Sequence, residues 1–242
     1  LRSTKMNGMR WLVDLRGHGD SPPEPDSASK TSYDDYVFGD IPMLARHVKA
    51  QHPELPVAFI GHSLSGHASI ASLSVEPDLP IDAVVSLAAN VWIKQLEPSL
   101  PRWALKFLIM NLFSLTATVA GRYPARALRM GSDDEAAPYV HQLAHFARNN
   151  FWGSRCGYQN YLENMSQITT PILSVVGTAD TWMCQPKWAE RWLQHAVNSE
   201  VEYRVVGTRD DDPQGIDHMK LVTDLRMKPI WDEIARWVLD KV

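Results

Sequence analysis

Short apolar segments alternate with helix-like segments along most of this chain. The apolar segments have the length and residue types of buried strands, and the segments between them have helical spacing or small side chains. Such alternation predicts an α/β fold with a mostly parallel sheet and helices on both of its faces. We expect strands over residues 10–15, 56–60, 83–89, 172–177 and 201–206, and helices over 33–49, 64–75, 186–197 and 227–241.

One break is expected inside the first of these helices. Pro42 lies within the apolar pattern of residues 33–49. Proline is tolerated in the first turn of a helix but not in its interior. We therefore expect a second helix to begin here, capped by Asp40.

The alternation stops over residues 91–165, which have helical character and no strand pattern. We interpret them as a helical cap, or lid, inserted between two parts of the core, residues 1–90 and 166–242. The stretch from Trp103 to Gly121 is long and apolar, but it contains Lys106 and Asn111. A membrane span needs about 20 apolar residues with few or no charges. A buried or lid helix is therefore expected, with no stable membrane insertion.

Composition narrows the class of protein. The 242 residues have a net charge of -4, whereas a nucleic-acid-binding surface needs a basic face. The two cysteines, Cys156 and Cys184, form no C-x-x-C motif, and the first ten residues do not have the pattern of a signal peptide. We expect a cytoplasmic protein that does not bind nucleic acid, with the oligomeric state left open.

The sequence Gly61-His62-Ser63-Leu64-Ser65-Gly66 is the strongest local signal for chemistry. It follows an apolar strand and precedes a helix of small residues. A sharp turn between strand and helix exposes a serine nucleophile, and only small flanking residues fit such a turn. Ser63 is therefore the candidate nucleophile. The alternative is a Gly/Ser turn without chemistry.

An acid and a base follow in the order expected for a catalytic triad. Asp180 comes after strand 172–177, at the sheet edge where ligands of parallel α/β proteins bind. Its alternative role is a helix cap. The acid position after the preceding strand holds Asn90, which has no charge. His218 lies in a loop after the last strand, whereas His62, next to the nucleophile, is expected only to pack.

Metal chemistry has little support in the pattern. His141 and His145 have the i, i+4 spacing of a metal pair but lack the Glu of H-E-x-x-H. One helix would supply only two ligands, so we expect no metal and no cofactor.

Four segments together resemble the α/β-hydrolase family, in its serine esterase and lipase-like branch. They are DLRGHGDS at 14–21, GHSLSG at 61–66, PILSVVGTAD at 171–180 and GIDHM at 215–219. The resemblance implies a triad of Ser63, Asp180 and His218, with the Leu64 N–H as an oxyanion-hole donor. Ser65 departs from the family's second glycine. The family also has a further strand before DLRGHGDS that carries the other oxyanion donor, so we expect about 50 or more upstream residues in the native gene.

These observations favour hydrolysis of a small-molecule carboxylic ester or thioester through an acyl-enzyme. The alternative is a non-catalytic or inactive binding protein on the same scaffold, since one of the two oxyanion donors is not found. The sequence does not identify the acyl group or the leaving group. It also leaves open whether an amide or a carbon–carbon bond is cleaved instead of an ester.

Overall fold

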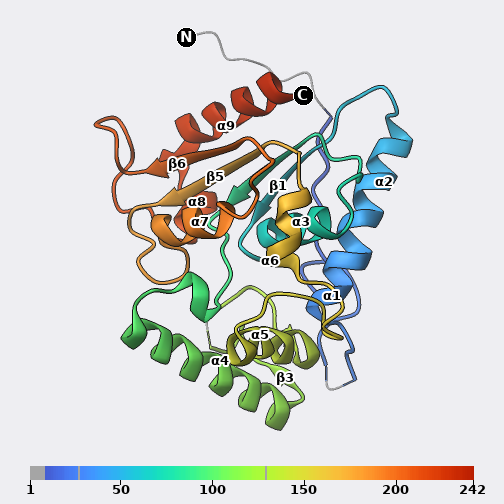
Figure 1. The fold of residues 1–242 in the computed structure, drawn as a ribbon, viewed down its shortest axis with the longest axis vertical. Coiled ribbons are helices and arrows are strands. Elements are labelled where there is room, and N and C mark those ends of the chain that lie inside the picture. Colours follow the sequence, from blue (N-terminus) through green and yellow to red (C-terminus); the bar gives the residue numbers. More distant parts are fainter. Residues whose placement is uncertain (1–8, 27, 129) are drawn as a thin grey trace.

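Four parallel strands form the central sheet in the computed structural model, which describes residues 9–242 except 27 and 129. Their spatial order is β1 (Ala58–His62), β2 (Ala83–Leu87), β5 (Ile172–Gly177) and β6 (Val201–Val206) (Figure 1). β2 and β5 are buried along their whole length, as expected for central strands covered on both faces. The predicted fold class and four of the five predicted strands are confirmed.

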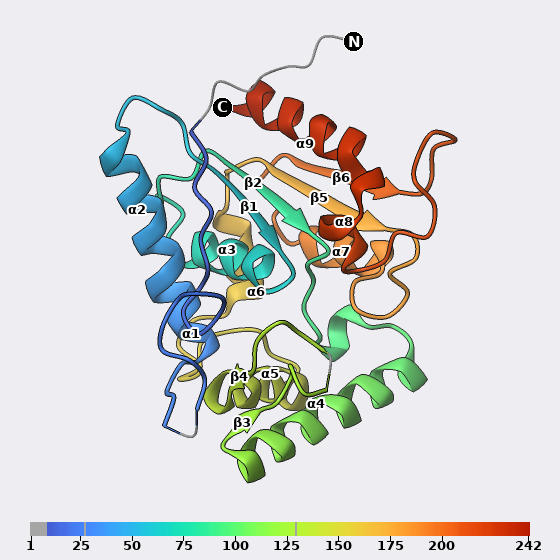
Figure 2. The ribbon, with the colours of Figure 1, turned by 180° about the vertical axis from the view of Figure 1, so that it is seen from behind.

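Helices cover both faces of this sheet (Figures 1 and 2). α2 (Ile41–Gln51), α3 (Leu64–Val75) and α6 (Tyr161–Asn164) pack together on one face, with Ile70 and Leu73 in their shared core. α9 (Lys228–Lys241) covers the other face with Ile230, Ile234 and Val238. α7 (Pro186–Leu193), α8 (Lys220–Thr223) and a 3-10 turn over Leu225–Met227 complete the C-terminal part.

The predicted break at Pro42 is present, although its cap is not. α1 (Tyr33–Asp35) continues through a π-helical turn over Tyr36–Asp40 into α2, and Pro42 lies in the first turn of α2. Asp40 has helical backbone angles and caps nothing. Its carboxylate instead accepts hydrogen bonds from Arg16 N at 3.1 Å and Arg16 Nε at 2.7 Å.

The strand predicted over residues 10–15 is wrong. These residues form no strand, and Leu12 is fully exposed. Trp11 contacts His47 and His52 near the end of α2 rather than the sheet. A strand exists only where a neighbour completes its hydrogen bonds, and β1 is paired only with β2 among the described residues.

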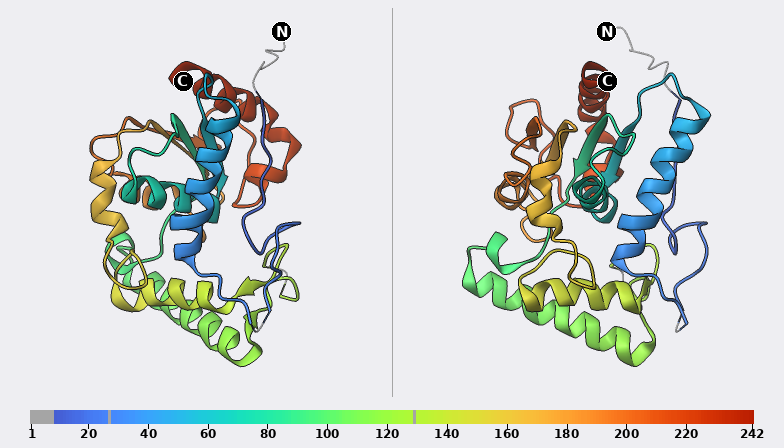
Figure 3. Two further views of the ribbon diagram at one scale, coloured as in Figure 1. Left: turned by 90° about the vertical axis from the view of Figure 1, so that its right-hand side faces the viewer. Right: turned by 45° about the vertical axis from the view of Figure 1, so that its right-hand side comes forward.

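A separate helical layer lies beyond one end of the sheet (Figure 3). After a 3-10 turn over Lys94–Leu96, α4 (Leu100–Ala120) packs against α5 (Ala137–Asn149). β3 (Arg122–Tyr123) and β4 (Glu135–Ala136) pair antiparallel between them, so the expectation of a strand-free segment is wrong in this detail. A 3-10 turn over Met165–Gln167 returns the chain to the sheet.

Within the described residues, α4 is the one helix long and apolar enough to span a membrane by length and composition. Of the 18-residue stretch of α4 that meets this criterion, 28% is buried. The buried positions Trp103, Met110 and Ala117 recur at helical spacing on one side. Trp103 and Met110 lie in one cluster with Ala144 and Ala147 of α5, so α4 packs as one partner of a helix pair.

Candidate active site

Ser63 lies at a strained turn between β1 and α3. Its backbone has φ 51° and ψ -112°, a conformation that residues with a side chain rarely adopt. The turn is held from both sides, because Ser63 N donates to Leu87 O at 2.9 Å and Ser63 O accepts from His67 N at 3.1 Å. Strain of this kind persists only where surrounding contacts fix it, and it often marks a functional site.

Two glycines make room for this turn. A Cβ on Gly61 would lie 2.6 Å from Gly66 N, and one on Gly66 would lie 2.9 Å from Gly61 O. Ser65 occupies the position of the second motif glycine and fits there, because its hydroxyl donates to His62 O at 3.0 Å. The departure from the glycine pattern is therefore accommodated by one hydrogen bond to the backbone of the turn.

Asp180 lies just beyond the C-terminal end of β5 and is 3% exposed. One carboxylate oxygen, Oδ1, accepts hydrogen bonds from the N–H groups of Met183 and Cys184, both at 2.9 Å. The other, Oδ2, accepts from His218 Nδ1 at 2.8 Å. The carboxylate therefore orders the loop that follows it and also contacts the histidine. It does not cap α7, as the alternative from the sequence would require, because that helix begins at Pro186 with Gln185 at its N-cap position.

The loop that carries His218 is built around a buried carboxylate. Asp212 accepts hydrogen bonds from Arg204 of β6 and from the backbone N–H groups of Gly207, Thr208 and Arg209. The Arg204 guanidinium and these N–H groups hold the pKa of Asp212 well below its usual range. The ionised Asp212 thus fixes the start of the segment that leads to His218.

The structure brings the three predicted residues to one edge of the sheet. β1, β5 and β6 are parallel, so the segments after them, with Ser63, Asp180 and His218, leave the sheet at the same end. The His62 ring, next to Ser63 in the chain, lies 4.8 Å from the His218 ring. Within the described part of the chain, Ser63 Oγ and His218 are not hydrogen-bonded to each other.

His62 has a contact that sequence reasoning missed. Its Nε2–H donates to the backbone O of His218 at 2.9 Å. Burial lowers the pKa of His62, so the ring stays neutral near pH 7 and keeps one proton for this bond. His62 therefore anchors the His218 loop. Only its place beside Ser63 hints at this in the sequence, because its partner lies 156 residues away.

A second histidine lies behind Ser63. His67, one helical turn after Ser63, shares a hydrogen bond with the Tyr33 hydroxyl at 2.8 Å and stacks on that ring. Burial lowers the pKa of His67 to about 3. This neutral pair belongs to the packing beneath the turn.

Leu64 is the first residue of α3. A helix has no internal partner for its first N–H groups, and its N-terminus carries a partial positive charge. The Leu64 N–H is the first of these donors and directly follows Ser63 in the chain.

The histidine pair on α5 makes local contacts. His141 Nε2 lies 3.0 Å from Thr118 Oγ1, and His145 Nδ1 accepts from Asn149 at 3.0 Å. Among the described residues, no group of three or more His, Cys, Asp or Glu side chains is placed to bind a metal ion.

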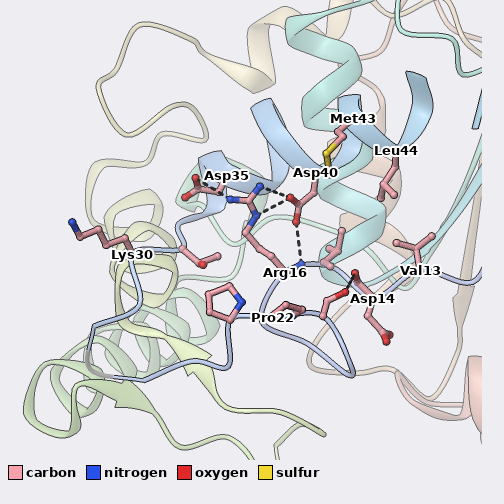
Figure 4. A pocket seen from close by; sticks show the side chains of 13 residues that line it. Val13, Asp14, Arg16, Pro22, Lys30, Asp35, Asp40, Met43 and Leu44 are labelled. Carbon is pink, nitrogen blue, oxygen red and sulfur yellow. Dashed lines mark hydrogen bonds and ion pairs between the residues drawn. The ribbon is translucent and has the colours of Figure 1, made fainter. Parts of the chain in front are cut away.

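A pocket of about 530 Å³ lies on the segment around RGHGDS, away from the Ser63 turn (Figure 4). Arg16 is held in its wall by Asp40 and by Asp35, whose carboxylate lies 3.5 Å from the guanidinium. None of Ser63, Asp180 and His218 lines it. Two ion pairs of Arg16 cross the wall of this pocket.

Comparison with protein-family models gives one match, to the family described as "Serine aminopeptidase, S33", over residues 7–207. Similar solved structures include a monoacylglycerol lipase of Paleococcus ferrophilus, 17% identical with a TM-score of 0.56, covering 95% of this chain and 82% of that one. Another is a soluble variant of monoglyceride lipase from Saccharomyces cerevisiae, 15% identical with a TM-score of 0.60, covering 93% and 74%. No curated protein matches the sequence.

Proposed function

Because this chain belongs to the serine aminopeptidase family of α/β-hydrolases, we propose that it is a serine hydrolase that cleaves small carboxylic esters or thioesters. The observation that carries the proposal is the 2.8 Å hydrogen bond between His218 Nδ1 and Asp180 Oδ2, at the same sheet edge as the strained Ser63 turn. In that arrangement His218 has one ring nitrogen held by a buried carboxylate and the other free to act as a base.

Acylation follows from these positions. Ser63 Oγ attacks the carbonyl carbon of the ester while His218 Nε2 takes the hydroxyl proton. The oxyanion of the tetrahedral intermediate accepts a hydrogen bond from the Leu64 N–H, and Asp180 stabilises the imidazolium of His218. The intermediate then collapses, the bond to the alcohol or thiol breaks, and His218 returns the proton to that leaving group.

Deacylation repeats the same transfers with water. His218 removes a proton from water as its oxygen attacks the acyl carbon, and the acyl–Ser63 bond breaks. Ser63 regains its proton from His218, and the carboxylic acid leaves. The leaving group remains unassigned, since the fold hosts many reactions.

We also propose that residues 91–165 act as a cap that shields the acyl chain. Phe113 on α4 is partly buried, its ring is tilted against that of Tyr123 with the centroids 4.5 Å apart, and it packs against the core cluster that includes residues of α3. Phe107 is more exposed and lies beside Trp103. Replacing Phe113 with Ala should therefore shift the preferred acyl length more than replacing Phe107, measured as the ratio of kcat/KM for short and medium acyl esters.

Turnover of a panel of p-nitrophenyl esters tests the proposed reaction. Wild-type protein should hydrolyse at least one ester, and His218→Ala should lower kcat by about 10³-fold or more. Ser132→Ala, which changes an exposed serine of the cap, is the matched control and should leave kcat unchanged. Ester turnover that survives in His218→Ala would contradict the triad. Ligand binding without turnover of any ester would favour the binding protein.

A further inference from the structure

The carboxylate of Asp180 depends on the loop that follows it. This acid loop, residues 180–185, folds back so that the N–H groups of Met183 and Cys184 point at Oδ1. The same carboxylate holds His218 through Oδ2. Any movement of the loop therefore changes the hydrogen bonds that orient the carboxylate toward the base.

The backbone carbonyls of the acid loop are held by the cap layer. Trp92 Nε1 donates to Met183 O at 3.0 Å, and Arg102 Nη1 donates to Thr181 O at 2.6 Å. Gln185 of the loop itself also donates to Thr181 O. The Met183 residue is thus bonded on one side to Asp180 and on the other side to Trp92.

A buried ion pair lies against Trp92, and its lysine is one helical turn after Arg102 on α4. Lys106 Nζ donates to Glu97 Oε2 at 2.9 Å, and their side chains are 3% and 2% exposed. Lys106 Nζ also lies 4.8 Å from the centre of the Trp92 ring. The same Glu97 oxygen accepts from Trp188 Nε1 of α7, the helix that follows the acid loop. Glu97 therefore links Lys106, near the start of α4, to α7, the helix that follows the acid loop.

We propose that Trp92 and Arg102 are positioning residues for Asp180, so that the cap controls the orientation of the catalytic acid. The inference rests on the proposed function, because it assigns Asp180 its part in the triad. Neither residue contacts the reacting atoms. A displacement of the start of α4 would withdraw both donors from the acid loop and loosen the carboxylate behind His218.

Single-donor deletions test this coupling. Trp92→Phe removes the indole N–H and keeps an aromatic ring against Trp182. Arg102→Met removes the guanidinium, which donates to Thr181 O and lies 5.6 Å from the centre of the Trp188 ring, and keeps an unbranched side chain. Each should lower kcat by about tenfold, the effect expected for loss of one directed hydrogen bond, with KM changed less than about twofold. Arg102→Lys, which retains a donor, should recover part of the kcat lost in Arg102→Met.

The matched control is Trp237→Phe on α9, which removes an indole donor to Glu202 of β6, away from the acid loop. It should leave kcat and KM as in wild type. Equal kcat in wild type, Trp92→Phe and Arg102→Met would overturn the proposal. A rise in KM alone would also overturn it, because the residues would then act on substrate binding.

A second measurement does not need turnover. Proton NMR can follow the downfield resonance of the His218 Nδ1–H that bonds to Asp180. Trp92→Phe and Arg102→Met should broaden this signal through faster exchange with water, and Trp237→Phe should not. An unchanged resonance in both cap variants would refute the positioning. The proposed function can fail independently. If the wild-type protein hydrolyses no ester but the two cap variants still broaden the resonance, the coupling is supported and the proposed function is not.

Discussion

Helices α3 and α4 are both rich in apolar residues, but they differ in how many of their side chains are buried. α3 buries eight of its twelve residues, and these include Ser69, Ser72 and Ser74. α4 buries five of 21 residues and leaves leucines such as Leu108 and Leu112 exposed. α3 lies between the sheet and the helices α2 and α6, whereas α4 is the outer member of a helix pair (Figure 1). Burial here follows the place of a helix in the layers more closely than its hydropathy.

The hydroxyl groups of the buried serines of α3 donate hydrogen bonds to nearby backbone carbonyls. Ser69 Oγ donates to Ser65 O at 2.7 Å, and Ser72 Oγ donates to Val37 O at 2.8 Å. A hydroxyl bonded in this way can be buried at little cost. On α4, by contrast, the buried Lys106 depends on a single ionic partner, Glu97. The two helices should therefore respond differently to substitution.

The largest expected effect is on that ion pair. Lys106→Met should lower the free energy of unfolding by about 3–5 kcal/mol, because Glu97 would remain buried without its cation. The double variant Lys106→Met/Glu97→Leu should recover more than half of that loss. Chemical denaturation measures both. A single-variant loss below about 1 kcal/mol would show that the pair is solvated in the native protein.

The next effect concerns the close approach of α3 to the sheet. Gly66→Ala should cost about 2–3 kcal/mol, although alanine is the better helix former, because its Cβ would lie 2.9 Å from both Gly61 O and Ala89 Cβ. In the cap loop, Gly131→Ala is the control, since its nearest neighbour would lie 3.5 Å away. Equal stability of the two variants would mean that α3 can shift away from the sheet.

A smaller effect should appear with pH. His67 on α3 has a pKa lowered to about 3 in the folded protein, against 6.5 for the unfolded chain. The unfolded state therefore binds a proton first as pH falls, so this histidine makes the folded state less stable between pH 6.5 and pH 3. The limiting slope for one proton is about 1.4 kcal/mol per pH unit. His67→Gln should flatten the pH dependence of the melting temperature, and an unaltered slope would refute the assignment.

The smallest effect is expected on the outer face of α4. Leu112→Ala should change the free energy of unfolding by no more than about 0.5 kcal/mol, because the side chain is 55% exposed. Met110→Ala, two positions away on the buried stripe, should cost about 2 kcal/mol or more. A loss at Leu112 as large as that at Met110 would show that another surface covers this face.

Elements defined by local signals could be predicted well from the sequence. α3, β5 and β6 have the predicted bounds: Gly177 ends β5, Gly207 directly follows β6, and Pro77 lies just after the end of α3. Residues 10–15 could not be placed, because strand formation depends on a neighbouring segment and not on composition alone. β3 and β4 have two residues each, too few for any periodicity.

The residues of the candidate site also fall into those that the sequence could predict and those that it could not. Ser63, Asp180 and His218 stand out because each follows a strand end in a fixed chain order. His62, Trp92 and Arg102 do not, because each donates to a backbone carbonyl far away in the sequence. Because every residue has a backbone carbonyl, the residue type does not show which position will accept such a hydrogen bond.

Reaction with a fluorophosphonate probe, followed by peptide mass spectrometry, tests the central claim most directly, since the probe forms a covalent bond only with an activated serine. The account predicts one adduct, mapped to Ser63, that disappears in Ser63→Ala and forms far more slowly in His218→Ala. Labelling of a different serine, or labelling that persists unchanged in Ser63→Ala, would contradict it.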